Sequence, residues 1–356
     1  MKQSKKSYVI GAVFLLLLMA GTFYFILKDC DFDALIQVVK DVNPVFLIGG
    51  LLCVLLFISC EGLNISMLMK SMGQNISVVN SIKFAFVGFY FSAITPSASG
   101  GQPMQIYFMQ REKHPVSLTT LCFLLIGAVY QIVMLCFGGL MFLLKSSFLS
   151  ANMRGIHILL FYGMAVNLIL ISLIFLVIFS PGIIRRTAGF FVRLLSRMKM
   201  IKEEERALQA VEHSIEEYKQ GAQHIKKNPK TLGKVFLVTA VQLTAFYSVP
   251  FFVYHAMRLS GHGYLEMIAT ECILMISVSS LPLPGAVGAS EASFLTIFSI
   301  FFGGNVVPAM LLSRGISFYS YLVISGVVTI ISYVRVSRKR QRKMPIPGGV
   351  ALSFEK

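Results

Sequence analysis

Long apolar runs recur along this chain and determine its architecture. Six of them have about the 20 residues that an α-helix needs to cross the hydrocarbon core of a bilayer. They cover residues 8–27, 44–69, 118–144, 156–179, 232–257 and 308–334. The first run lacks a clear small-residue cleavage site, so we interpret it as a retained span rather than a signal peptide. The pattern predicts an all-α integral membrane protein with about six continuous spans.

Two further apolar segments are interrupted by residues that break helices. Residues 84–110 contain "TPSASGGQP" at 95–103, and residues 264–302 contain "PLPGAVGASE" at 282–291. Inside a bilayer, non-helical backbone is tolerated only where it is buried in protein or lines a wet cavity. We therefore interpret each break as the tip of a helical hairpin that forms one wall of a site. The alternative is a structural kink packed against neighbouring helices.

The distribution of positive charge predicts the orientation of both hairpins. If residues 84–110 dip into the membrane and return to the same side, one side carries 25 Lys and Arg in its flanking segments and the other carries five. Positive charge in short flanking segments stays cytoplasmic. We thus expect a cell-membrane protein with both termini cytoplasmic and two re-entrant hairpins of opposite orientation. Inverted pairs of interrupted helices mark substrate sites in many transporters.

The remaining segments fit one transmembrane domain at residues 1–335 with a basic cytoplasmic tail at 336–356. Residues 182–231 form a cytoplasmic amphipathic insertion within that domain. Its first part, "PGIIRRTAGFFVRLLSRMKM", interleaves arginine with apolar residues, as an interfacial helix on an anionic membrane surface does. Its second part repeats apolar residues at steps of three and four from Leu208 to Ile225, which predicts a helix that needs a partner surface.

Ionisable residues within apolar segments are the strongest candidates for function, because charge at membrane depth is costly and usually faces the protein interior. The chain has Glu61 in the second span, Glu271 and Glu291 in the two limbs of the second hairpin, and Arg314 in the last span. A basic side chain suits a phosphate, and an acidic one suits an ammonium group. The alternative for Glu291 and Arg314 is a structural ion pair that holds the hairpin in place.

The candidate substrate-binding residues combine these groups with the two breaks. They are Thr95, Pro96, Ser97, Ser99, Gly100, Gly101, Gln102, Pro284, Gly285, Gly288, Glu291, Arg314, Glu271 and Glu61. We expect the glycines to permit close approach of backbone and ligand, and the returning half-helices to direct partly positive N-termini toward an anion.

A family resemblance rests on both breaks. "TPSASGGQPMQIYFMQREKHP" followed by a span, and "PLPGAVGASEASF" near the C-terminal end, resemble the signature stretches of the lysylphosphatidylglycerol synthase transmembrane region, a flippase-like family. It includes the membrane half of the bacterial multiple peptide resistance factor. Where many members have Gly-Glu and Arg-Glu, this chain has Gly101-Gln102 and Ser290-Glu291.

The resemblance implies a role with phospholipid. Bifunctional members add a soluble domain that moves lysine from lysyl-tRNA to phosphatidylglycerol, and we expect no such domain in this chain, which ends at Lys356. We therefore expect binding and translocation of an aminoacylated phosphatidylglycerol or related lipid. The alternatives are phosphatidylglycerol lysyltransferase activity, alone or with a separate soluble synthase, and an ion or small-solute carrier. A second copy of the chain, in a homo-oligomer, is a further candidate partner.

Composition excludes several other classes. Hydrophobic residues make up 56% of the chain, and the mean hydropathy is +0.74. The net charge of +16 is spread over membrane-flanking segments, so it does not indicate nucleic-acid binding. The six cysteines and six histidines form no metal-binding or disulfide motif, and there is no Walker-type loop for ATP. We expect no cofactor, no metal and no catalytic residue.

Overall fold

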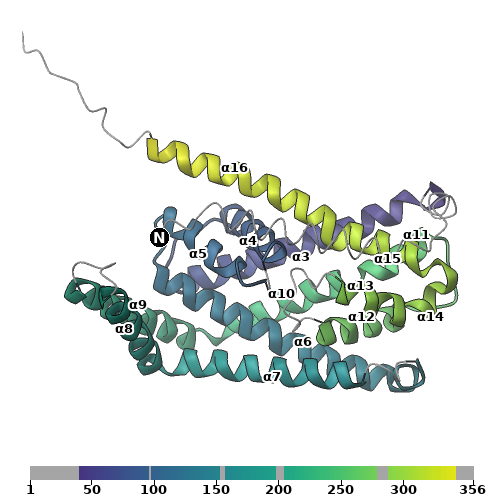
Figure 1. The fold of residues 1–356 in the computed structure, drawn as a ribbon, viewed down its shortest axis with the longest axis horizontal. Coiled ribbons are helices and arrows are strands. Elements are labelled where there is room, and N and C mark those ends of the chain that lie inside the picture. The colour runs from purple at the N-terminus through teal and green to yellow at the C-terminus, as the bar shows by residue number, and fades with distance from the viewer. Residues whose placement is uncertain (1–39, 96–97, 153–156, 198–203, 279–287, 342–356) are drawn as a thin grey trace, which may run out of the picture.

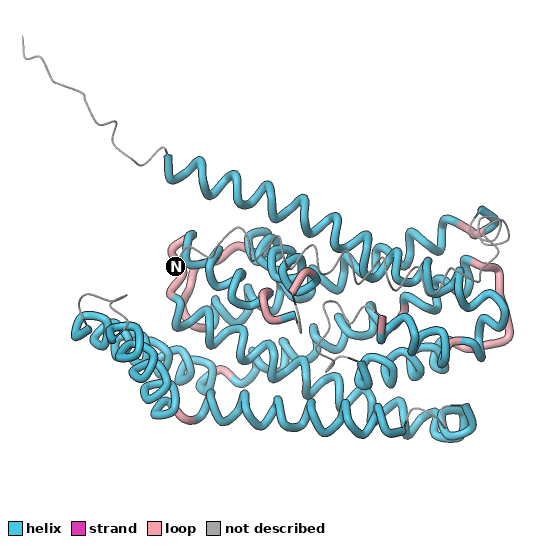
Figure 2. The backbone as a smooth tube through the Cα atoms, in the orientation of Figure 1, coloured by secondary structure: helices cyan, strands magenta, loops and turns pink. Residues whose placement is uncertain are grey.

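The computed structural model describes residues 40–95, 98–152, 157–197, 204–278 and 288–341, and this part of the chain is all helical (Figure 2). The elements run in the order α3 (Pro44–Ser71), α4 (Val78–Ala93), α5 (Gly101–Arg111), α6 (Val116–Asn152), α7 (His157–Phe179), α8 (Pro181–Arg197), α9 (Glu204–Lys227), α10 (Pro229–Tyr247), α11 (Val249–Ala256), α12 (Tyr264–Val278), α13 (Ala289–Ile297), α14 (Ser299–Phe302), the short 3-10 helix η3 (Gly303–Asn305), α15 (Val306–Arg314), the π-helix η4 (Gly315–Ser320) and α16 (Tyr321–Gln341).

Five helical segments within the described residues are long and apolar enough to cross a membrane. They are Pro44–Ser71, Val116–Leu149, Leu160–Ile178, Pro229–Ala256 and Ser299–Val334. Each overlaps one of the predicted spans, although the last begins at Ser299 rather than at residue 308. The prediction of a multi-pass membrane protein is therefore confirmed. The predicted span at residues 8–27 lies outside the described residues.

The two hairpin regions occupy opposite halves of the helical bundle. Figure 1 shows α4 and α5 in the half next to α8 and α9, whereas α12, α13 and α14 lie in the other half. The C-terminal end of α16 lies at the same end of the bundle as α8 and α9. The described residues thus place the two interrupted segments at opposite ends.

Helix starts follow local sequence signals. The Asn43 side chain accepts a hydrogen bond of 3.0 Å from the Val45 amide, and Pro44 occupies the first turn of α3. Ser77 caps α4 by accepting from the Asn80 amide at 3.2 Å. These caps satisfy amides that have no partner within the helix, so they fix where each helix begins.

Two predicted spans are subdivided in the structure. The span at 232–257 changes from α10 to α11 at Ser248, two residues before Pro250, which has no amide hydrogen to donate. The span at 308–334 contains the π-helical turn η4 directly after Arg314. Apolar periodicity did not predict that turn, and π-helical turns are frequent at functional sites.

Glycines allow several helices to pack very closely. A methyl group on Gly62 would lie 2.5 Å from the Ile82 Cα of α4, and one on Gly163 would lie 2.1 Å from the Ile276 carbonyl oxygen of α12. Contacts this short exclude any side chain. Small residues at such crossings are typical of membrane helices, where close packing replaces the hydrophobic driving force.

The surface of α7 is apolar. Large side chains along it are exposed, among them Ile158, Phe161, Leu173 and Leu176. In water such a surface would be an association hazard. In a membrane it faces lipid, as expected for a spanning helix.

The predicted amphipathic insertion forms two helices that pack on one another, α8 and α9. The apolar face of α9, with Ile215, Tyr218 and Ile225 buried, packs on the start of α6. The partner surface that the sequence required is therefore supplied by the chain itself.

Candidate functional site

The second hairpin and the last span are joined by a buried ion pair. The Nε atom of Arg314 donates to Oε1 of Glu291 at 2.7 Å, and the exposed fractions of the two side chains are 11% and 1%. The guanidinium also lies over the Phe318 ring, 4.7 Å from its centroid. Both charges are thus held deep in the protein, as the sequence predicted.

Glu291 also stabilises the start of α13. Its Oε2 accepts hydrogen bonds from the Gly288 amide at 2.6 Å and from the Ser290 hydroxyl at 3.1 Å. Gly288 has a φ of +88°, a conformation that disfavours other residues. The carboxylate therefore caps the helix after the break and pairs with Arg314 at the same time.

Glu271 is a buried carboxyl group that still has a free position to accept a hydrogen bond among the described residues. It lies on α12 and is 6% exposed, and its Oε2 has no hydrogen-bond partner among the described residues. The Arg314 guanidinium lies within electrostatic range of it. We call Glu271, Glu291 and Arg314 the polar cluster. Its two acidic groups and one basic group come from three helices.

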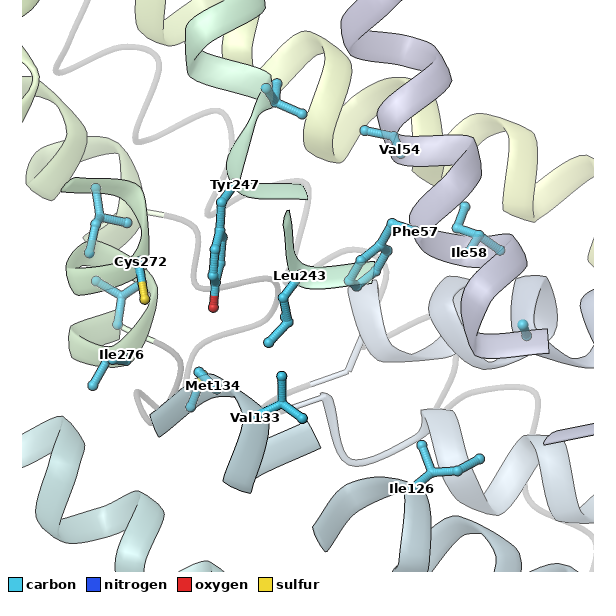
Figure 3. Packing of buried hydrophobic residues seen from close by; sticks show 14 of the residues in the cluster. Val54, Phe57, Ile58, Ile126, Val133, Met134, Leu243, Tyr247, Cys272 and Ile276 are labelled. Atoms are coloured by element: carbon cyan, nitrogen blue, oxygen red, sulfur yellow. The ribbon is translucent and has the colours of Figure 1, made fainter. Parts of the chain in front are cut away.

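An aromatic side chain lies beside the polar cluster. Figure 3 shows the Tyr247 ring extending toward α6, next to Cys272 and Leu243. Tyr247 is 1% exposed, and Glu271 lies within electrostatic range of its hydroxyl. Nothing in the apolar pattern of α10 indicated this placement.

Glu61 belongs to a separate polar network between α3 and α10. Its Oε2 accepts from Gln242 Nε2 at 3.1 Å, and the Gln242 oxygen accepts from Asn64 Nδ2 at 3.4 Å. Asn64 also donates to the Thr239 hydroxyl at 3.0 Å.

The first break closes an antiparallel pair of helices. Lys83 at the start of α4 forms an ion pair with Glu112 just after the end of α5. At the other end, Thr95 accepts a hydrogen bond from the Gly100 amide at 2.9 Å and donates to the Phe91 carbonyl oxygen at 2.6 Å. The chain therefore turns back on itself between the two helices.

The glycines of this break serve helix packing. A Cβ on Gly100 would lie 2.7 Å from Thr95 Cγ2, and one on Gly101 would lie 2.1 Å from the Ser92 hydroxyl oxygen and 2.9 Å from the Gly88 carbonyl oxygen. These neighbours all belong to α4 or to the turn that follows it. Contact of Gly100 and Gly101 with a ligand stays a prediction.

The other predicted residues of the breaks are dispersed. Ser99 and Gln102 are exposed, and Gln102 points near Gly127 of α6. Pro96, Ser97, Pro284 and Gly285 lie outside the described residues. No group of three or more metal-binding side chains occurs in the described ranges.

Sequence reasoning missed Gln105, which holds the first hairpin together. Its side chain is buried, and Nε2 donates to the Phe84 carbonyl oxygen at 3.2 Å. Gly88 makes room for it, because a Cβ there would lie 2.2 Å from Gln105 Cδ. An amide one helical turn after the break, in an otherwise apolar stretch, was the available signal.

We expect Gly88→Ala to destabilise the protein by about 1 to 3 kcal/mol, the usual cost of overpacking. Shortening the obstructing side chain in Gly88→Ala with Gln105→Ala should recover part of that loss. Thermal unfolding in detergent measures both effects. Gly139→Ala is the control, because no atom within 4 Å would meet its Cβ. Equal unfolding midpoints for Gly88→Ala and Gly139→Ala would contradict the packing account.

Comparisons with known proteins agree with this architecture. Residues 8–325 match the family described as "Lysylphosphatidylglycerol synthase TM region". A "UPF0104 membrane protein" of Archaeoglobus fulgidus is 22% identical over 320 residues, which cover 87% of this chain and 93% of that protein. Since the family match spans most of the sequence and both signature breaks, the chain belongs to the family of the lysylphosphatidylglycerol synthase transmembrane region.

Proposed function

We propose that this protein binds phospholipid headgroups at the polar cluster and translocates the lipid between leaflets. An aminoacylated phosphatidylglycerol, such as the lysyl form, is the best chemical match. The observation that carries the proposal is Glu271, a carboxyl group buried in a membrane protein with one oxygen unbonded among the described residues. Such groups are costly and are usually kept for a ligand or ion pathway.

The charges of the polar cluster fit a headgroup that carries both signs. Arg314 brings a positive charge to the cluster, which suits the phosphate of a headgroup, and its Nε is bonded to Glu291. Glu271 then accepts from an ammonium group of the aminoacyl moiety. Because two carboxyl groups accompany one guanidinium, the cluster favours a headgroup with an extra positive charge over a purely anionic one.

Family membership supports a role with lipid, and the opposed hairpins support transport. We propose that α4–α5 re-enters from the cytoplasmic side and α12–α13 from the external side, so that both termini are cytoplasmic. The Lys83–Glu112 pair between the outer ends of α4 and α5 supports this threading. Helix termini that meet at mid-membrane from opposite sides are a common arrangement around substrates.

A labelling experiment tests the threading of the first hairpin. We expect Arg111→Cys, at the exposed end of α5, to react with a membrane-impermeant maleimide from the same side as Glu212→Cys of α9. Lys145→Cys, at the other end of α6, should react from the opposite side. The unsubstituted protein serves as the blank for its native cysteines. Reaction of Arg111→Cys from the Lys145 side would show that α4–α5 crosses the membrane.

Headgroup binding is tested by lipid-dependent stability. A ligand that binds only the folded state raises the unfolding temperature, and at equal concentration a tighter ligand raises it more. We expect lysyl-phosphatidylglycerol to raise that temperature more than phosphatidylglycerol or phosphatidylcholine at equal concentration in detergent. Equal stabilisation by all three lipids would contradict headgroup recognition at the polar cluster.

A further inference from the structure

An apolar cavity lies where the amphipathic helix α9 meets the spans α6 and α7. Its volume is about 380 Å³, within the range of small-ligand sites. Its walls include Val116 and Leu124 of α6, Val177 of α7, and Val211 and Ile215 of α9. None of these residues belongs to the polar cluster.

The cavity arises from the way α9 rests on α6. Near its C-terminal end α9 approaches closely, because a Cβ on Gly221 would lie 2.6 Å from Leu118 Cδ2. The cavity-lining residues of α9 all precede that contact and end at Tyr218. The cavity is therefore an open one between helices that touch at one end, and Ser214 in its wall is exposed.

One lining residue, Tyr218, carries a buried hydroxyl group without a partner among the described residues. Tyr218 lines the cavity and is 4% exposed, and its hydroxyl has no hydrogen-bond partner among the described residues. Burial raises the pKa of this hydroxyl to about 12, so it remains protonated and can donate. A buried donor normally has an acceptor, and a ligand with an oxygen next to an apolar chain would supply one.

The surroundings of the cavity identify the class of ligand. On α7, Val177 stands beside Leu173 and Leu176, which are 52% and 49% exposed on the apolar, lipid-facing surface. On the other side, α8 is basic, and its Arg185 pairs with Glu212 next to the cavity wall. A site between lipid-facing apolar residues and exposed arginines matches an anionic phospholipid.

We propose that this cavity holds an acyl chain of an anionic phospholipid from the leaflet on the α8–α9 side. The Tyr218 hydroxyl donates to an ester oxygen of that lipid, and Arg186, which is exposed on α8, faces its phosphate. The lipid fills the space between α9 and the spans, so it secures the amphipathic helices to the transmembrane bundle. This site is independent of the translocation proposed above.

Photolabelling of the full chain in vesicles tests the proposal. The probe is phosphatidylglycerol with a diazirine on one acyl chain, diluted in phosphatidylcholine vesicles. After irradiation, peptide mapping should locate adducts on residues 116–124 and 210–218. Unlabelled phosphatidylglycerol should compete better than unlabelled phosphatidylcholine. Equal competition would overturn the anionic part of the proposal, and no adduct on either segment would overturn it entirely.

A cavity-filling variant gives the decisive comparison. Ser214→Leu places a larger side chain in the cavity wall, and excluding two methylene groups of the ligand corresponds to about a tenfold loss of labelling. Gln220→Leu adds the same side chain on the exposed face of α9 and should label like the unsubstituted protein. Circular dichroism and gel filtration establish that both variants are folded. Undiminished labelling of folded Ser214→Leu at both segments would overturn the acyl-chain assignment.

Discussion

Replacing Arg314 with glutamine is expected to destabilise the protein by about 3 to 5 kcal/mol and to abolish translocation, because it leaves Glu291 charged, buried and without its ionic partner. Glu291 is 1% exposed, so water cannot take the place of the guanidinium. The amide and hydroxyl that donate to its other oxygen remain, but they do not neutralise the charge. Chemical unfolding in detergent measures the loss.

Arg111→Gln is the matched control, since Arg111 is exposed at the end of α5 and lies over the Tyr107 ring. We expect its unfolding free energy to change by less than about 0.5 kcal/mol. Wild-type stability in Arg314→Gln would contradict the buried pair. A charge exchange, Glu291→Arg with Arg314→Glu, is a poorer test, because arginine at position 291 cannot accept from the Gly288 amide.

The second large effect is expected at Glu271. Glu271→Gln should lower the rate of lipid translocation about 10- to 100-fold, the equivalent of losing one hydrogen bond to a charged group. Stability should fall little, because Oε2 makes no hydrogen bond among the described residues and glutamine keeps the shape of the side chain. The unfolding midpoint and the translocation rate of the same preparation measure the two effects.

Glu266→Gln provides the control on the same helix. Glu266 stands at the start of α12 and pairs with Lys145 at 3.2 Å, away from the polar cluster. We expect translocation by this variant at nearly the unsubstituted rate. If Glu271→Gln also translocates at that rate while remaining folded, Glu271 is not part of the headgroup site. The search would then move to Glu61 and Gln102.

Sequence patterns predicted the spans well because bilayer thickness imposes a length and a composition that few other structures share. They did not predict the break at Ser248 or the π-helical turn after Arg314. Both breaks occur within runs that remain apolar, so hydropathy does not change there. Pro250 was the one local signal, whereas the π-helical turn depends on packing against neighbouring helices.

The role of the candidate residues in binding stays a prediction. Isolated charges in apolar runs pointed to Glu271, Glu291 and Arg314; the structure joins Glu291 to Arg314, and Glu271 lies within electrostatic range of the guanidinium. Sequence gave no partner for Glu61, because Gln242 is 181 positions away along the chain. Gln242 could have been noticed as a lone amide in an apolar span. The sequence pattern does not tell which neighbouring helix its side chain faces.

The roles of the glycines could not be predicted from the sequence either. Gly100 and Gly101 were predicted to allow a ligand close to the backbone, and the structure shows Thr95 and Ser92 in the space that a side chain would need. A glycine in the sequence indicates that another group lies close to the backbone, but it does not tell whether that group is a ligand or a neighbouring side chain. Packing within the hairpin accounts for both glycines, and their contact with a ligand stays a prediction.

Leaflet-resolved translocation in vesicles tests the central claim most directly. The protein is reconstituted with lysyl-phosphatidylglycerol, and a membrane-impermeant amine reagent measures how fast lipid from the inner leaflet reaches the outer one. We predict translocation well above that of protein-free vesicles, with a strong decrease in Glu271→Gln and none in Glu266→Gln. The account predicts slower movement of phosphatidylcholine, followed with a headgroup-specific reagent. Translocation no faster than in protein-free vesicles, by folded protein in either orientation and for every headgroup, would contradict it.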